Sequence, residues 1–145
     1  MTKLSVLEVL ETATLGGIGL WATREQVQDR LGAPDTHGLD DALWVYGVFE
    51  LVFDGNDRLR RIYSDHFGRP GVPGTDGRPT DMGFLRRNMG RRAVSEEFRR
   101  AGWAKLRHET SPSLPELSYL CFPSGARLMF APDGLFGLIV DSQVW

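Results

Sequence analysis

The sequence has little of several features that mark particular classes of protein. It contains one cysteine, Cys121, among 145 residues. A single cysteine rules out an intramolecular disulfide, argues against a four-ligand zinc site and favours a reducing, cytoplasmic location. No apolar run is long enough to span a membrane, so no membrane partner is expected. Glu8 and Glu11 interrupt the first apolar segment, which predicts an amphipathic helix rather than a signal peptide.

Residue patterns that carry catalysis or metal binding are also scarce. His37, His66 and His108 fall in separate loops or at the ends of predicted elements, and none has a metal-ligand spacing. Residues 54–57 read Asp-Gly-Asn-Asp, a fragment of a calcium loop that lacks its final glutamate, and a hairpin turn explains them better. The sequence therefore predicts no catalytic residue, no metal and no cofactor, and favours a non-enzymatic protein.

Charge is distributed unevenly along the chain. Residues 1–68 contain 6 Lys+Arg and 11 Asp+Glu, whereas residues 69–145 contain 11 Lys+Arg and 8 Asp+Glu. Eight of those cations lie in the segment 86–107. Such a cluster can track phosphates, yet the acidic pI of about 5.9 argues against nucleic acid as the partner.

Two parts of the chain follow one pattern, residues 44–65 and residues 124–141. The matched positions are Gly47 with Gly125, Leu51 with Leu128, Phe53 with Phe130, Leu59 with Leu135, Ile62 with Leu138, and Asp65 with Asp141. Each copy alternates apolar and polar residues on both sides of a tight turn, which is typical of a β-hairpin. A predicted helical segment precedes each hairpin.

The repeat predicts an α+β protein made of two fused helix-helix-β-hairpin repeats, which form one antiparallel sheet with helices on one face. The first repeat is expected at 1–66, a Gly/Pro-rich linker at 67–80 and the second repeat at 81–145. Thr23 and Gln26 predict a capping box. The other expected elements are a loop at 35–41, strands at 43–53 and 58–64, a short helix at 84–89, a helix capped by Ser95, and strands near 117–122, 126–131 and 135–141.

The first repeat resembles a known unit. Its segment Thr23-x-x-x-Val27-x-x-x-Leu31-Gly32-x-Pro34 precedes a strand with Trp44 and Tyr46 and a Phe-Asp-Gly hairpin. This order is similar to the unit of the BamE-like (SmpA/OmlA) lipoproteins, and tandem copies of a related unit build the β-lactamase inhibitor protein. The resemblance implies a sheet surface presented to another protein, as in immunity proteins that neutralise a toxin domain. The sequence departs from these families in lacking a lipidation cysteine near its start and cysteine pairs.

Alternation along the strands predicts which face of the sheet binds. One face should point toward the helices and carry Leu51, Phe53, Ile62, Leu128, Phe130 and Leu138. The opposite face is expected to bind a partner protein, because tyrosine, tryptophan, arginine and methionine are enriched at interfaces. The predicted binding residues are Trp44, Tyr46, Glu50, Arg61, Tyr63, Tyr119, Arg127 and Met129.

Three other interpretations remain open. The same face can pair with a second copy of the chain as a homodimer. A cleft between the repeats, with Asp65, His66 and Asp141 converging, would indicate a small-ligand binder or an enzyme. The arginine cluster at 86–107 would indicate a nucleic-acid-binding accessory protein.

Overall fold

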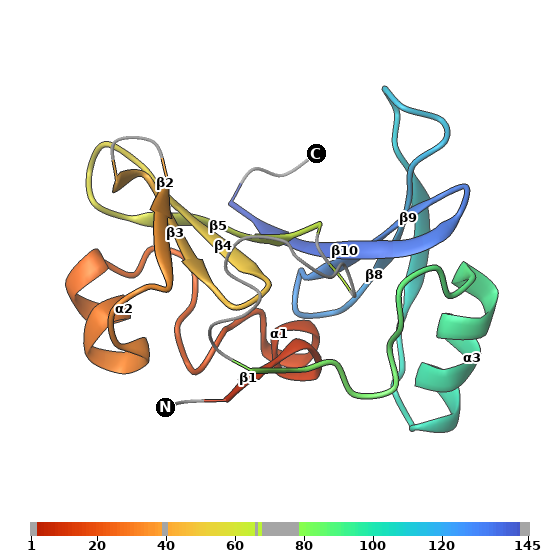
Figure 1. Cartoon of the computed structure of the whole chain (residues 1–145). Coiled ribbons are helices and arrows are strands. Elements are labelled where there is room, and N and C mark those ends of the chain that lie inside the picture. The colour runs from red at the N-terminus through yellow and green to blue at the C-terminus, as the bar shows by residue number, and fades with distance from the viewer. Residues whose placement is uncertain (1–2, 39–40, 66, 68–78, 143–145) are drawn as a thin grey trace.

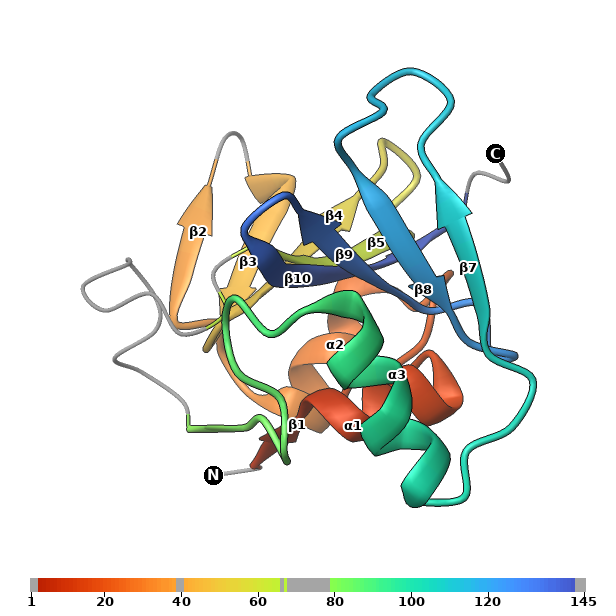
Figure 2. The same cartoon turned by 90° about the vertical axis from the view of Figure 1, so that its right-hand side faces the viewer.

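The protein has an α+β structure with its helices on one side of a large sheet (Figures 1 and 2). The computed structural model describes residues 3–38, 41–65, 67 and 79–142. Within these residues the chain forms three helices and an eight-stranded antiparallel sheet. The prediction of one antiparallel sheet with helices on one face is confirmed.

The strands follow a regular order across the sheet. From one edge to the other they are β2 (Thr36–Gly38), β3 (Leu43–Tyr46), β4 (Phe49–Phe53), β5 (Leu59–Ser64), β10 (Gly134–Asp141), β9 (Arg127–Ala131), β8 (Ser118–Cys121) and β7 (Arg107–Thr110). Sequential strands are therefore neighbours on each side of the central pair, β5 and β10. The interpretation of the two sides as copies of one unit stays a prediction.

A second, parallel strand pair ties the start of the chain to its middle. β1 (Leu4–Ser5) pairs with β6 (Thr80–Asp81), close to the first helix. Of the predicted linker at 67–80, residues 68–78 lie outside the described residues. Phe67 is fully buried, so this end of the predicted linker packs into the body of the protein.

The helices are α1 (Val6–Thr12), α2 (Arg24–Leu31) and α3 (Arg91–Arg100). None of them is long and apolar enough to cross a membrane, within the part of the chain that the structure describes. α2 begins as predicted. The Gln26 N–H donates to the Thr23 hydroxyl over 3.1 Å, and the Thr23 N–H donates to the Gln26 side chain over 2.9 Å. This capping box satisfies two N–H groups that the helix itself leaves unpaired.

Removing the cap should measurably weaken the fold. Thr23→Ala is expected to lower the free energy of unfolding by about 1 kcal/mol, because the Gln26 N–H loses its acceptor. Thr23→Ser keeps a hydroxyl and should lose much less. Urea unfolding followed by circular dichroism measures both. Equal losses in the two variants would show that the threonine methyl, and not the cap, stabilises this end of α2.

The main core lies between the sheet and the helices. The six side chains predicted to face the helices are all buried there, with exposed fractions of 4% or less. α3 adds Phe98, whose ring packs edge-on against Phe84, Trp103 and Phe122 at centroid distances of 4.8 to 5.0 Å. The alternation of apolar residues thus assigned the buried face of the sheet correctly.

Two expectations about the helices are wrong. Residues 84–89 form turns instead of a short helix. Ser95 does not cap a helix, because α3 starts at Arg91 with Gly90 as its N-cap. The segment Arg91-Arg-Ala-Val94 consists largely of good helix formers, so the helix extends one turn before the apparent start signal. Ser95 therefore lies inside the helix and is buried.

The strand predictions missed the edges of the sheet. The polar segment expected as a loop at 35–41 contains β2, and β7 was not predicted either. The strand expected over 43–53 is two strands, which Gly47 and Val48 join in a tight turn. Edge strands such as β2 and β7 are half-exposed to solvent, so they do not need the alternating apolar residues that reveal inner strands.

Candidate functional site

The face of the sheet turned away from the helices, here called the helix-free face, is the candidate site. Within the described residues no helix lies on this side (Figure 1). The side chains that define the face are Glu50, Val52, Arg61, Tyr63, Tyr119, Cys121, Arg127, Met129, Phe136, Ile139 and Asp141. Six of the eight predicted binding residues are among them: Glu50, Arg61, Tyr63, Tyr119, Arg127 and Met129.

Strand register aligns these side chains in rows. Glu50 lies opposite Tyr63, Tyr63 opposite Ile139, and Ile139 opposite Arg127. Arg127 in turn lies opposite Cys121, so one row crosses β4, β5, β10, β9 and β8. Side chains opposite one another on neighbouring strands are in contact distance, and the row therefore forms a continuous surface across the centre of the sheet.

An apolar cluster occupies the middle of the helix-free face. Tyr119, Cys121, Met129 and Ile139 are each 6 or 7% exposed and form a cluster separate from the main core. Tyr63 packs against them from β5, and Phe136 packs against them from β10. The face therefore carries a small second core, and the Tyr63 and Phe136 rings are its half-buried members.

Charged side chains border this cluster in defined contacts. The Arg61 guanidinium donates to the Asp141 carboxylate, with Nη2 at 2.9 Å and Nε at 3.1 Å from Oδ2. The Arg61 side chain stays 43% exposed, whereas that of Asp141 is 6% exposed. The Arg127 guanidinium lies over the Tyr119 ring, 5.2 Å from its centroid. These contacts fix both arginines and leave part of Arg61 open to solvent.

Two titratable side chains on this face, Tyr63 and Cys121, are held in their neutral forms. Burial raises the pKa of Tyr63 to about 12, and the Asp65 carboxylate contributes through its charge and a hydrogen bond. Burial also raises the pKa of the Cys121 thiol, and the negative charge of Glu109 adds to the effect. Tyr63 is therefore a hydroxyl donor at neutral pH, and Cys121 is a thiol rather than a reactive thiolate.

Two predicted binding residues lie on the wrong side of the sheet. Trp44 and Tyr46 face the helices and are 4% and 0% exposed. The Trp44 Nε1–H donates to Asp41 over 2.6 Å, and the Tyr46 hydroxyl donates to the Gly32 carbonyl oxygen over 2.8 Å. Both are core residues, and neither can contact a partner on the helix-free face.

The composition of β3 explains why Trp44 and Tyr46 were assigned to the wrong face. Its sequence, Leu-Trp-Val-Tyr, is apolar throughout, so alternation cannot tell one face from the other. The tight turn after β3 sets the register and places Trp44 opposite Leu51 and Tyr46 opposite Phe49. Because directly paired residues share a face, the buried partners on β4 carry both aromatic rings into the core.

Sequence reasoning also left Phe136 and Asp141 out of the predicted binding set. A register shift between Leu135 and Gly137 interrupts the alternation of β10. Such a bulge re-aims the side chains around it, and Phe136 joins the helix-free cluster for this reason. A glycine inside an apolar strand is the sequence signal for a bulge, and Gly137 provides it.

Comparisons with known proteins give no further guidance. No protein-family model, curated protein or solved structure matches this chain. The resemblance to the BamE-like unit and to the β-lactamase inhibitor protein stays a prediction.

Two of the three predicted cleft residues lie at opposite ends of the β5–β10 pair, since Asp141 is opposite Arg61 and Asp65 follows Ser64, which is opposite Leu138. Asp141 pairs with Arg61 on the sheet, and Asp65 interacts with Tyr63. His66 lies outside the described residues. Within the described part of the chain, no group of three or more His, Cys, Asp or Glu side chains can hold a metal ion. Residues 54–57 form a turn in which the Asp54 carboxylate accepts from two backbone N–H groups.

The arginine cluster at 86–107 is not a continuous basic stripe. Several of its members are held in local contacts: Arg92 with Glu96, Arg100 with Glu97, Arg107 with Glu109, and Arg87 with the carbonyl oxygen of Phe67. A surface that tracks a nucleic-acid backbone needs several uncompensated cations in line. The observed pairing leaves a smaller, local cationic site at α3.

Proposed function

We propose that this chain binds another protein through its helix-free face and acts like an immunity protein or inhibitor, covering a working site of that partner. The observation that supports the proposal is the separate apolar cluster of Tyr119, Cys121, Met129 and Ile139 on the side that bears no described helix. These four side chains are themselves buried, so the apolar surface open to a partner is that of the half-buried Tyr63 and Phe136 rings packed beside them. Exposed apolar surface is a common mark of a protein–protein interface. The proposed action is blockade, which needs no catalytic group.

The composition of the face suits such a role. Tyrosine, arginine and methionine are over-represented among residues that dominate binding energies. Tyr63 is half-buried and offers a partner its ring edge and a hydroxyl oxygen that can accept, because its O–H donates to Asp65. Arg61 bonds only one Asp141 oxygen through two of its nitrogens, and a guanidinium has five N–H donors. A partner carboxylate can therefore bind Arg61 without displacing Asp141.

The expected partner thus presents apolar side chains toward the cluster and a carboxylate toward Arg61. The domain of a toxin is the kind of partner that the immunity-like role implies. Because Arg61 and Asp141 are already paired, the surface is organised before binding, which reduces the entropy lost on association.

The proposal is tested with Tyr63. Tyr63→Ala is expected to weaken partner binding by about 30-fold or more, because hot-spot truncations cost about 2 kcal/mol or more. The tagged chain first captures its partner from the host lysate, and calorimetry with the purified partner then gives the affinities. Tyr63→Phe keeps the ring and should retain most of the affinity.

A control on the opposite side of the molecule gives the test its specificity. Gln28 is exposed on α2, and Gln28→Ala should bind as the unmodified chain does. Equal binding by Tyr63→Ala and Gln28→Ala would place the interface elsewhere and contradict the proposal. If sedimentation shows a concentration-dependent homodimer that Tyr63→Ala abolishes, the face binds a second copy of the chain instead of a different protein.

A further inference from the structure

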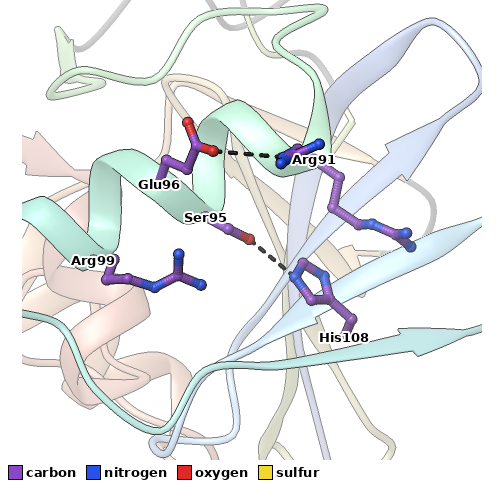
Figure 3. A pocket seen from close by; sticks show the side chains of 6 residues that line it. Arg91, Ser95, Glu96, Arg99 and His108 are labelled. Carbon is purple, nitrogen blue, oxygen red and sulfur yellow. Dashed lines mark hydrogen bonds and ion pairs between the residues drawn. The ribbon is translucent and has the colours of Figure 1, made fainter.

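A small cationic hollow lies between α3 and the edge strand β7, away from the cluster on the helix-free face. It has a volume of about 330 Å³ and is lined by Arg91, Arg92, Ser95, Glu96, Arg99 and His108. Arg91, Ser95 and Arg99 are four residues apart, so they follow one another along one side of the helix. Figure 3 shows the two arginines extending on either side of Ser95, with His108 facing it from β7.

The centre of the hollow is a polar pair held in place. Ser95 Oγ and His108 Nε2 are 3.0 Å apart, and Ser95 is 6% exposed. Burial lowers the pKa of His108, and the positive charges of Arg91 and Arg99 lower it further. The imidazole is therefore neutral at neutral pH, and both side chains offer hydrogen bonds without adding charge.

The two arginines stand out by their lack of counter-charge. Among the described residues, neither Arg91 nor Arg99 has an ion-pair or hydrogen-bond partner, whereas the neighbouring Arg92 and Arg100 pair with glutamates. Glu96 is the one carboxylate that lines the hollow. Figure 3 shows its carboxylate turned away from His108, and its ion pair with Arg92 has a separation of 3.5 Å. The positive charge around Ser95 and His108 is thus uncompensated.

We propose that this hollow binds a phosphate dianion, either free or as the terminal group of a small phosphate ester. Two guanidinium groups on opposite sides can donate to different oxygens of a tetrahedral anion, since each carries a planar set of N–H donors. The Ser95–His108 pair keeps one donor for a remaining oxygen. This donor is the Ser95 hydroxyl when His108 Nε2–H donates to Ser95 Oγ, or His108 Nδ1–H when the Ser95 hydroxyl donates to Nε2. A planar carboxylate has only two oxygens, so it would use fewer of these donors.

The size and isolation of the hollow favour a small ligand over a nucleic acid. A volume of about 330 Å³ exceeds that of a bare phosphate and leaves room for a compact organic group. Of the next cations along the described chain, Arg100 pairs with Glu97 and Arg107 with Glu109, which leaves Lys105 alone between them. One isolated cation does not extend the site into the row of charges that a polynucleotide needs.

The test follows the ring signals of His108 by NMR during titration with inorganic phosphate and, separately, with phenyl phosphate. Ionic strength is held constant with sodium chloride, and His108→Gln identifies the signals. A saturable shift is expected with at least one probe, and the tighter probe shows whether the site takes the free ion or an ester. Bound phosphate should also raise the pKa of His108, because its negative charge offsets Arg91 and Arg99.

Arg99 and Arg100 provide matched variants, because both side chains are exposed on α3. Arg99→Gln should weaken phosphate binding by about tenfold, as expected for the loss of a charge-assisted hydrogen bond. Arg100→Gln, which removes a cation already paired with Glu97, should change it little. Three results would overturn the proposal: a shift that sodium chloride alone reproduces, equal weakening in both variants, or an oligonucleotide that binds at α3 while neither phosphate probe does.

Discussion

Gly137→Ala is expected to destabilise the protein by about 3 kcal/mol, as overpacking does where neighbours cannot move aside. Gly137 lies in β10, opposite Met129 of β9. A Cβ atom at this position would overlap the Ser64 carbonyl oxygen of β5 and lie 3.0 Å from the Asp65 Cα. Both neighbours are backbone atoms, so the clash is relieved only if the central strands separate. Urea unfolding followed by tryptophan fluorescence measures the loss.

Gly55→Ala is the matched control for this variant. An added Cβ at Gly55 has no neighbouring atom within 4 Å, so the same chemical change should alter the free energy of unfolding by less than about 1 kcal/mol. If Gly137→Ala and Gly55→Ala unfold at the same urea concentration, β5 and β10 do not approach as closely as the structure has them.

Trp44→Ala should have the second large effect, a loss of about 3 to 5 kcal/mol in the free energy of unfolding. The side chain is 4% exposed, and its ring packs edge-on against Phe53 at a centroid distance of 5.2 Å. Truncation also removes the donor that bonds Asp41. The loss therefore combines a cavity in the core with a broken hydrogen bond, and urea unfolding measures it.

Tyr63→Ala gives the comparison that assigns the two faces. Tyr63 is half-buried on the helix-free face, so its truncation should cost clearly less stability than that of Trp44. A Trp44→Ala protein as stable as Tyr63→Ala would mean that Trp44 faces outward, and that the register of β3 in the structure is wrong.

Much of the sheet was predictable because its inner strands alternate. Leu51 and Phe53 alternate with Glu50 and Val52, and this pattern identifies the buried face of β4 without any long-range information. β3 offers no such pattern, and only the turn at Gly47 and Val48 determines its register. The edge strands β2 and β7 are short and half-exposed, so their sequences lack the apolar alternation that predicts a strand.

The two candidate sites differ in how far the sequence alone predicts them. The polar and aromatic residues of the helix-free face follow from alternation in β4, β5 and β9. The hollow at α3 depends on Ser95 facing His108, a contact between residues from a helix and an edge strand that was not predicted. A helix that starts after Ser95 does not contain Arg91, so the sequence showed neither that Arg91 and Arg99 share a side of α3 nor that their neighbours are paired with glutamates.

The central strand pair has a consequence for how the chain folds. It brings Arg61 beside Asp141, 80 residues away in the sequence, whereas the flanking strands close through short hairpins. Closing such a long loop is entropically costly, so the flanking strands are expected to assemble before the centre. Until that step, β5 and β10 each present a bare edge to other chains. An unpaired β5 or β10 can therefore also pair with a strand of a second molecule. Refolding at low protein concentration favours the pairing of β5 with β10 within one molecule.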